Sequence, residues 1–130
     1  MNRKRAWIYC RIAYPNAAFL EIQEKNMIDY AKAQGLSIVG VTSEHGSGHD
    51  FSRDGMKAVS HAIEAGGVDV LLVKDLSRLG RDMEEMDVFL HWLKKHHVTL
   101  VCADGTMPQT YEDMLRCLIV EFERSHKTSV

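Results

Sequence analysis

The sequence predicts an α/β domain: a doubly wound, mostly parallel sheet of about four strands, alternating with helices that cover both faces. Short apolar runs alternate along the chain with stretches whose apolar residues recur at helical spacing. This alternation repeats in units of about thirty residues, the length of a strand–helix unit. The 130 residues, 45% of them apolar, are enough for a single domain (residues 1–130) with its own core.

The first strand is predicted at residues 6–12, a short apolar run rich in aromatic residues. Residues 14–16 have the composition of a turn and separate this strand from the next element. A helix is predicted from about Ala18, and Gly35 has the position of the glycine that caps a helix at its C-terminal end.

The same unit then repeats. The second strand is predicted at residues 37–41, followed by a polar loop at residues 43–52 and a helix that ends at Gly66. The continuous apolar run at residues 68–73 is typical of a strand buried on both faces, and residues 98–102 predict a fourth strand. Apolar stripes mark the second, third and last helices: Met56, Val59 and Ile63; Met86, Phe89, Leu90 and Leu93; Tyr111, Met114, Leu115, Leu118, Ile119 and Phe122.

The charge balance restricts the classes of function. Sixteen basic and eighteen acidic residues give a net charge of −2, so any contact with DNA must be local. The apolar start of the chain is interrupted by Arg11 after only a few residues, so a first strand is expected there and not a signal peptide. Because no apolar stretch approaches the ~20 residues that span a bilayer, we expect a cytoplasmic protein without membrane contact.

The cysteines and histidines do not predict a metal site or a cofactor. Cys10, Cys102 and Cys117 are odd in number and far apart, which favours reduced packing residues over disulfides or zinc ligands. The pair His96-His97 has no second pair at metal-binding spacing, so a solvated helix end is expected there.

Arginines gather in the loops that follow the strands. Arg11 lies near the end of the first strand, Arg53 near the start of the second helix, and Arg78 and Arg81 near the start of the third. In a parallel sheet these loops meet at one edge, where ligands bind, and planar guanidinium groups suit bidentate contact with phosphate. The sequence therefore predicts a phosphate-binding arginine cluster.

Two interpretations of Arg78 and Arg81 stay open. The helix dipole disfavours cations at a helix start, so the two arginines make sense there if they face a bound phosphate. Alternatively, they form ion pairs with acidic neighbours, namely Asp75, Asp82 or Glu85. Ser47, between two glycines, is by itself a weak signal of a phosphate loop.

Four segments together resemble the catalytic domain of the serine recombinases, the resolvase and invertase family: Tyr9-Cys10-Arg11-Ile12-Ala13, Ser47-Gly48, Arg53-Asp54-Gly55 and Leu76-Ser77-Arg78-Leu79-Gly80-Arg81. The resemblance covers nearly the whole chain. It implies a resolvase-like fold whose last amphipathic helix forms a subunit interface. About residues 110–126, which include Glu123-Arg124, would be the start of this interface helix. It also implies an origin in a mobile element.

The resemblance further implies site-specific DNA recombination, in which a serine after the first strand attacks a phosphodiester and forms a phosphoserine link without metal or cofactor. Arg11, Arg78 and Arg81 would then neutralise the scissile phosphate. The supporting phosphate or DNA contacts would come from Tyr9, Ser47, Arg53 and Ser77. The subunits would act as homodimers that meet as tetramers on crossover-site DNA.

The sequence departs from the family pattern in three places. Ala13 occupies the position of the nucleophile, and a methyl group cannot attack phosphorus, so catalysis is expected to be impaired. Asp54 replaces a proline and brings a negative charge near the expected phosphate site. No C-terminal DNA-binding domain is present within the 130 residues.

These departures leave several functions open. The first is an inactive recombinase-like domain, and its alternative is a regulatory or assembly subunit that associates with an active recombinase. A second hypothesis gives the attack to another hydroxyl, that of Tyr14, Ser43 or Ser47. A signalling receiver domain, with Asp75 as the phosphorylated residue, is disfavoured because the acidic pair and the lysine are missing. A nucleotide-binding module is disfavoured because neither glycine-rich motif occurs.

Overall fold

The computed structural model describes residues 3–46, 53–80 and 82–105. Within them lies a four-stranded sheet of order β2-β1-β3-β4, in which every neighbouring pair is parallel. The strands are β1 (Arg5–Ile12), β2 (Ser37–His45), β3 (Val70–Val73) and β4 (Thr99–Cys102). The predicted α/β class with a parallel sheet is therefore confirmed.

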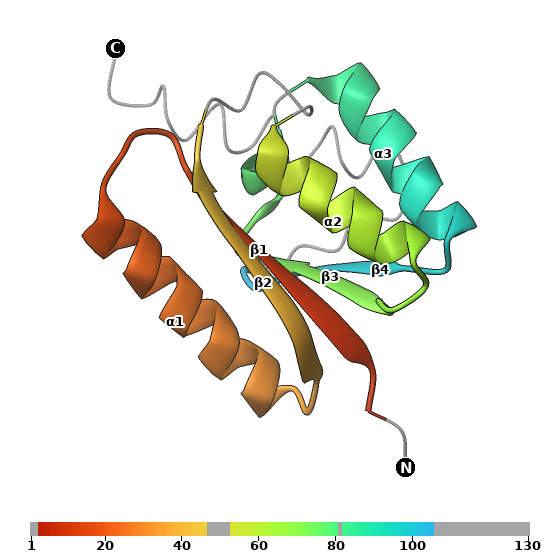
Figure 1. The fold of residues 1–130 in the computed structure, drawn as a ribbon, viewed down its shortest axis with the longest axis horizontal. Helices are drawn as coiled ribbons and strands as arrows, with labels where there is room; N and C mark the ends of the chain where they lie inside the picture. The colour runs from red at the N-terminus through yellow and green to blue at the C-terminus, as the bar shows by residue number, and fades with distance from the viewer. Residues whose placement is uncertain (1–2, 47–52, 81, 106–130) are drawn as a thin grey trace.

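The helices cover both faces of this sheet (Figure 1). Helix α1 (Ala17–Ala33) lies on one face, and α2 (Asp54–Glu64) and α3 (Met83–Lys95) lie on the other. A short 3-10 turn, η1 (Leu76–Arg78), joins β3 to the segment before α3. None of the helices in the described segments has the length and apolarity needed to cross a membrane. The predicted last helix, at about residues 110–126, lies outside the described residues.

The core consists of two apolar layers, one on each face of the sheet. Strand β3 contributes to both, because Leu71 and Val73 face α2 and α3 while Leu72 faces α1, as expected for a strand buried on both sides. The layer against α1 also contains Cys10, a free buried thiol, and Cys102 is buried in the layer against α2 and α3. These two cysteines are packing residues, as predicted, and Cys117 lies outside the described residues.

Several predicted boundaries differ from the structure, among them the end of β2 and the start of β3. Strand β2 continues to His45, so Ser43 is a strand residue and not part of a loop, because β1 pairs with this polar stretch up to Ile12↔His45. Strand β3 begins at Val70, two residues later than predicted, and Asp69 ahead of it bonds to Arg5 through both its side chain and its main chain.

A β-bulge in β2 decides which of its side chains face the site. The pairing shifts from Ala6↔Ile38 to Trp7↔Gly40, so Val39 is an extra residue without a partner on β1. Ile38 packs on the α1 face, and an unbroken strand would place Glu44, six residues later, on that same face. The bulge reverses the alternation, and Glu44 instead faces α2.

Candidate active site

The ends of the parallel strands bring Arg11, Arg53 and Arg78 together at one edge of the sheet. Arg11 and Arg53 both bond to main-chain oxygens of the segment that contains Arg78, which consists of η1 and the residue after it. Arg11 Nε donates to the carbonyl oxygen of Arg78 at 2.8 Å, and Arg53 Nη2 donates to that of Leu79, also at 2.8 Å. Arg81 and Ser47, the other residues predicted for this cluster, lie outside the described residues.

Arg11 is buried, and its guanidinium group binds main-chain carbonyl oxygens. Besides its bond to Arg78, it donates to the carbonyl oxygens of Gly46 at 2.7 Å and of Ser77 at 2.6 Å. Its exposed fraction is 3%. Arg11 therefore ties the end of β2 to η1, a structural role that the prediction of a phosphate contact did not include.

Gln23 holds the main chain of Arg11 through two hydrogen bonds. Its side-chain oxygen accepts from Arg11 N at 3.1 Å, and its side-chain nitrogen donates to Arg11 O at 3.3 Å. Gln23 is a buried polar residue on α1, so this amide pair fixes the helix against the end of β1. Sequence reasoning missed Gln23, although a glutamine in an apolar helical stripe was a usable signal.

Arg53 is held by Tyr9 and Glu44 on the α2 face. The Tyr9 hydroxyl donates to Glu44 Oε2 at 2.6 Å and accepts from Arg53 Nε at 3.1 Å. The Arg53 Nε also lies 3.5 Å from Glu44 Oε2, an ion pair whose side chains are 8% and 17% exposed. Sequence analysis predicted Tyr9 and Arg53 as phosphate contacts and missed Glu44, the carboxylate that pairs with the arginine.

Glu44 also caps the start of α2, which explains the glycine after Arg53-Asp54. Its Oε1 accepts from the backbone N–H of Gly55 at 3.0 Å, in the first turn of the helix. A Cβ atom on Gly55 would lie 2.2 Å from Glu44 Oε2. A glycine is therefore needed for the carboxylate to approach this closely, while Asp54 is exposed at the first position of the helix.

The surroundings of Tyr9 make it a poor acid. Burial and the hydrogen bond to the Glu44 carboxylate raise the pKa of its hydroxyl well above the usual value, and the nearby Arg53 opposes this only in part. The phenol therefore stays protonated at neutral pH, where it orients Glu44 and Arg53.

Among the described residues, some N–H groups of Arg78 have no hydrogen-bond partner. Its Nη1 donates to Arg11 O at 3.0 Å, and its Nε lies 3.5 Å from Asp75 Oδ2, beyond a good hydrogen bond. The Nε is buried without a hydrogen-bond partner, and among the described residues Nη2 has none either. Arg78 thus keeps donors for a further acceptor.

Asp75 connects the rest of this turn. Its carboxylate accepts from the Ser77 hydroxyl and faces Arg78, which is one of the ion pairs considered from the sequence. The argument from the helix dipole is wrong for Arg78, because this residue ends a 3-10 turn and α3 begins only at Met83. Asp82 instead caps α3 by accepting from Glu85 N at 3.0 Å.

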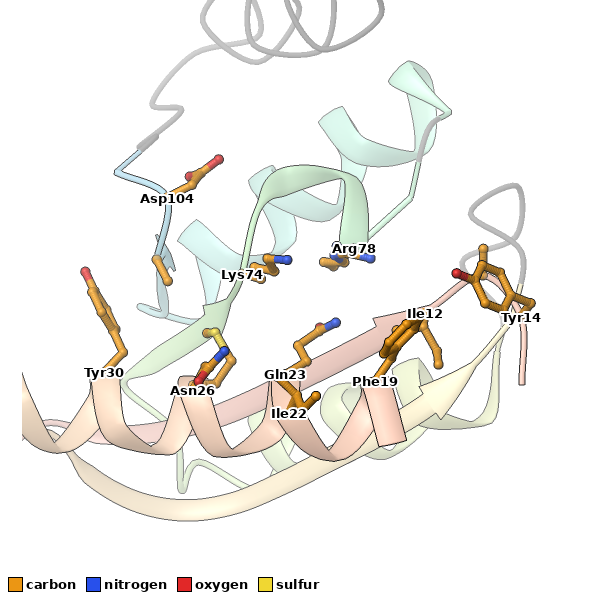
Figure 2. A pocket seen from close by; sticks show the side chains of 13 residues that line it. Ile12, Tyr14, Phe19, Ile22, Gln23, Asn26, Tyr30, Lys74, Arg78 and Asp104 are labelled. Atoms are coloured by element: carbon orange, nitrogen blue, oxygen red, sulfur yellow. The ribbon is translucent and has the colours of Figure 1, made fainter. Parts of the chain in front are cut away.

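Ala13 lies just beyond β1, where it is exposed and lines a cleft of about 610 Å³ together with Arg78 (Figure 2). Tyr14 lines the same cleft. Ser43 does not line it, and its hydroxyl donates to Glu24 Oε2 on α1 at 2.7 Å. Of the alternative nucleophiles considered, the structure thus places Tyr14 beside Ala13 and Ser43 elsewhere, and Ser47 lies outside the described residues.

No group of three or more histidine, cysteine, aspartate or glutamate side chains that could hold a metal ion occurs in residues 3–46, 53–80 and 82–105. The charged groups at the sheet edge include the three arginines and two carboxylates, Glu44 facing Arg53 and Asp75 facing Arg78. This arrangement defines an α/β domain with a cationic site at the carboxyl edge of its sheet, suited to phosphate.

Comparison with known families agrees with this class. Residues 6–126 match the family model described as "Resolvase, N terminal domain". Because the match covers nearly the whole chain, the chain belongs to this family, that of the serine recombinases.

Solved structures show the same fold. The N-terminal catalytic domain of TP901-1 integrase is 24% identical, with a TM-score of 0.74, and the alignment covers 94% of this chain and 98% of that one. The C-terminal catalytic domain of ISC1926 TnpA, an IS607-like serine recombinase, is also 24% identical, with a TM-score of 0.72 and coverage of 93% and 82%. A resolvase family site-specific recombinase from Streptococcus pneumoniae has the same identity and TM-score, 24% and 0.72, with coverage of 95% and 90%.

Proposed function

We propose that this domain acts in site-specific DNA recombination as a phosphate-binding subunit that does not itself cleave DNA. The observation that carries the proposal is the position of Ala13, exposed at the end of β1 in the same cleft as Arg78. The residue at the nucleophile position thus stands beside the arginine with free donors. In place of a serine hydroxyl it offers a methyl group, which has no lone pair for attack on phosphorus.

The three described arginines have different tasks in this proposal. Arg78 would contact the scissile phosphate directly through Nη2, which has no partner among the described residues, because this residue lines the cleft that contains Ala13. Arg11 and Arg53 would position the turn that carries Arg78, through their bonds to the carbonyl oxygens of Ser77 and Leu79. Arg81 and Ser47 remain proposed phosphate contacts from the family resemblance.

Restoring the nucleophile tests the proposal. The Ala13→Ser variant and the unaltered chain are incubated with a pool of negatively supercoiled plasmids that carry random inserts. Covalent protein–DNA adducts are isolated under denaturing conditions, and the linked residue is identified by mass spectrometry. We expect no adduct with the unaltered chain and a phosphoserine adduct at position 13 in the variant. Loss of a nucleophile costs a triad protease on the order of 10⁶-fold in rate, so background cleavage should be undetectable.

The outcomes separate the two parts of the proposal. An adduct formed by the unaltered chain refutes the inactivity, and an adduct at Tyr14 assigns the attack to the neighbouring hydroxyl. If the Ala13→Ser variant forms none, the proposal of an intact phosphate site is wrong. As a control, Ala13→Ser combined with Arg78→Gln should lose the gained cleavage, because this arginine is the proposed phosphate ligand.

A second candidate role is that of an assembly subunit that pairs with an active recombinase. The apolar stripe within residues 110–126, which includes Leu115 and Leu118, supports it, because such stripes are typical of helices that pack on a partner. Sedimentation velocity of the full chain should show self-association that the double variant Leu115→Asp, Leu118→Asp abolishes. If both the unaltered chain and the double variant sediment as monomers, self-association is contradicted. If the unaltered chain does not sediment together with an active family member, the mixed assembly is contradicted.

A further inference from the structure

The cleft beside Ala13 extends well beyond the residues used above. It lies between α1 and the loops that follow β1, β3 and β4 (Figure 2). The strand order β2-β1-β3-β4 reverses direction between β1 and β3, and open α/β sheets bind ligands at this switch point. Its volume of about 610 Å³ is within the usual range for small-molecule sites.

One wall of the cleft is cationic. Lys74 follows β3 directly and Arg78 lies four residues later, so both side chains come from one short loop. Lys74 is exposed, and its ammonium group has no hydrogen-bond or ion-pair partner among the described residues. Together with Arg78, whose Nη2 has no partner among the described residues, this wall offers two cationic groups to an anion, in a chain whose net charge is −2.

The opposite wall is apolar and aromatic. On α1, Phe19 is 53% exposed and Ile22 is 56% exposed, and Tyr14, 58% exposed, stands at the end of the cleft near Ala13. In Figure 2 Phe19 and Ile22 lie on α1 below the loop that carries Lys74 and Arg78, and Tyr14 lies at one end of the cleft. Aromatic rings exposed opposite cations are the combination that binds nucleotides, which stack their bases on the rings and place their phosphates on the cations.

We propose that this cleft binds a single nucleotide, with its phosphate on Lys74 and Arg78 and its base against Phe19 and Tyr14. The nucleotide is either free or part of a DNA strand, since both present the same chemistry. The carboxylate of Asp104, at the opposite end of the cleft from Tyr14 (Figure 2), disfavours a second anionic group there. The base is therefore expected toward Tyr14, next to Ala13.

This inference rests on the proposed function to the extent that Arg78 is shared, whereas Lys74 and Phe19 belong to the new site alone. The test is a titration of the full chain with each ligand, in which binding is measured from the NMR chemical shifts of the backbone amides. The ligands are a single-stranded tetranucleotide, a deoxynucleoside monophosphate, the nucleoside without phosphate, and inorganic phosphate. We expect the mononucleotide to bind more tightly than the nucleoside or phosphate, with the largest shifts on α1 and the loop after β3.

Two variants and two matched controls decide the result. Phe19→Ala should weaken binding of the mononucleotide by about fivefold or more, the lower end of base–aromatic stacking. Lys74→Gln should weaken it by at least about as much, because it removes a charged hydrogen bond to the phosphate. Lys57→Gln and Val88→Ala, exposed residues on α2 and α3 across the sheet, should leave it unchanged. A free-nucleotide site binds the mononucleotide at least as well as the tetranucleotide, and a DNA site favours the tetranucleotide.

The inference is overturned if both variants bind like the unaltered chain or if inorganic phosphate binds as tightly as the mononucleotide. These results do not depend on cleavage. If the chain binds the nucleotide but the Ala13→Ser variant gains no cleavage, the proposed function is refuted and the nucleotide site stands. If the variant cleaves DNA but the chain does not bind the nucleotide, only the nucleotide site is refuted.

Discussion

Replacing Arg11 by methionine should destabilise the whole domain, because its guanidinium group holds main-chain carbonyl oxygens rather than a surface charge. The variant removes its bonds to Gly46, Ser77 and Arg78, at 2.7, 2.6 and 2.8 Å. Each carbonyl oxygen left without a donor costs about 1–3 kcal/mol when buried. The bond to Ser77 is buried and the other two are part-buried, so the lower part of that range applies to the latter.

The expected loss is therefore roughly 3–5 kcal/mol of unfolding free energy, out of about 5–15 kcal/mol for a typical domain. Urea denaturation followed by far-ultraviolet circular dichroism measures it, and an unchanged m-value shows that both proteins unfold the same surface. Arg3→Met, at an exposed arginine, is the matched control and should change the free energy by less than about 0.5 kcal/mol. If Arg11 serves mainly to bind phosphate, Arg11→Met will be as stable as the unaltered chain, and the structural role is refuted.

Three further predictions follow from other contacts. Gly55→Ala should lower the unfolding free energy by about 1–2 kcal/mol in urea melts, because its Cβ atom would lie 2.2 Å from Glu44 Oε2 and displace this carboxylate; equal stability contradicts the close approach. Arg5 lowers the pKa of Asp69 from 3.8 to about 2, so the ion pair contributes stability above pH 3.8 that is lost as the pH falls toward 2. The difference in urea midpoint between the unaltered chain and Asp69→Asn should accordingly shrink over this interval, and a constant difference contradicts the linkage. Burial raises the pKa of the Cys10 thiol to about 11, so alkylation at pH 8, read by mass spectrometry, should label it only after denaturation; rapid labelling of the folded chain contradicts its burial.

The α/β class could be predicted from sequence because it depends on periodicity, which is local. The run that forms β3 is apolar on both faces, and the stripes of α2 and α3 place Met56, Met86 and Leu93 in the core, as the structure confirms. The end of β2 could not be predicted in this way. Its residues Thr42 to His45 are polar, and pairing with β1, a tertiary contact, keeps them in the sheet.

The convergence of Arg11, Arg53 and Arg78 could be predicted because carboxyl ends of parallel strands share one edge. Their individual tasks could not, because these depend on which acceptors surround each guanidinium group. Glu44 was hidden for a similar reason. Alternation along an unbroken β2 assigns it to the α1 face, and only the bulge at Val39 turns it toward Tyr9 and Arg53.

The different surroundings of the arginines change what Ala13 implies. A site whose arginines all served phosphate alone would lose its purpose together with the nucleophile. Here Arg11 and Arg53 also stabilise the turn after β3, so folding maintains them whether or not the chain cleaves DNA. Arg78 lines the cleft that contains Ala13, and its Nη2 has no partner among the described residues, so folding does not engage all of its donors there. The variant Arg78→Gln should accordingly keep most of the stability while it weakens anion binding, and this contrast with Arg11→Met separates the residue that binds from the residues that support it.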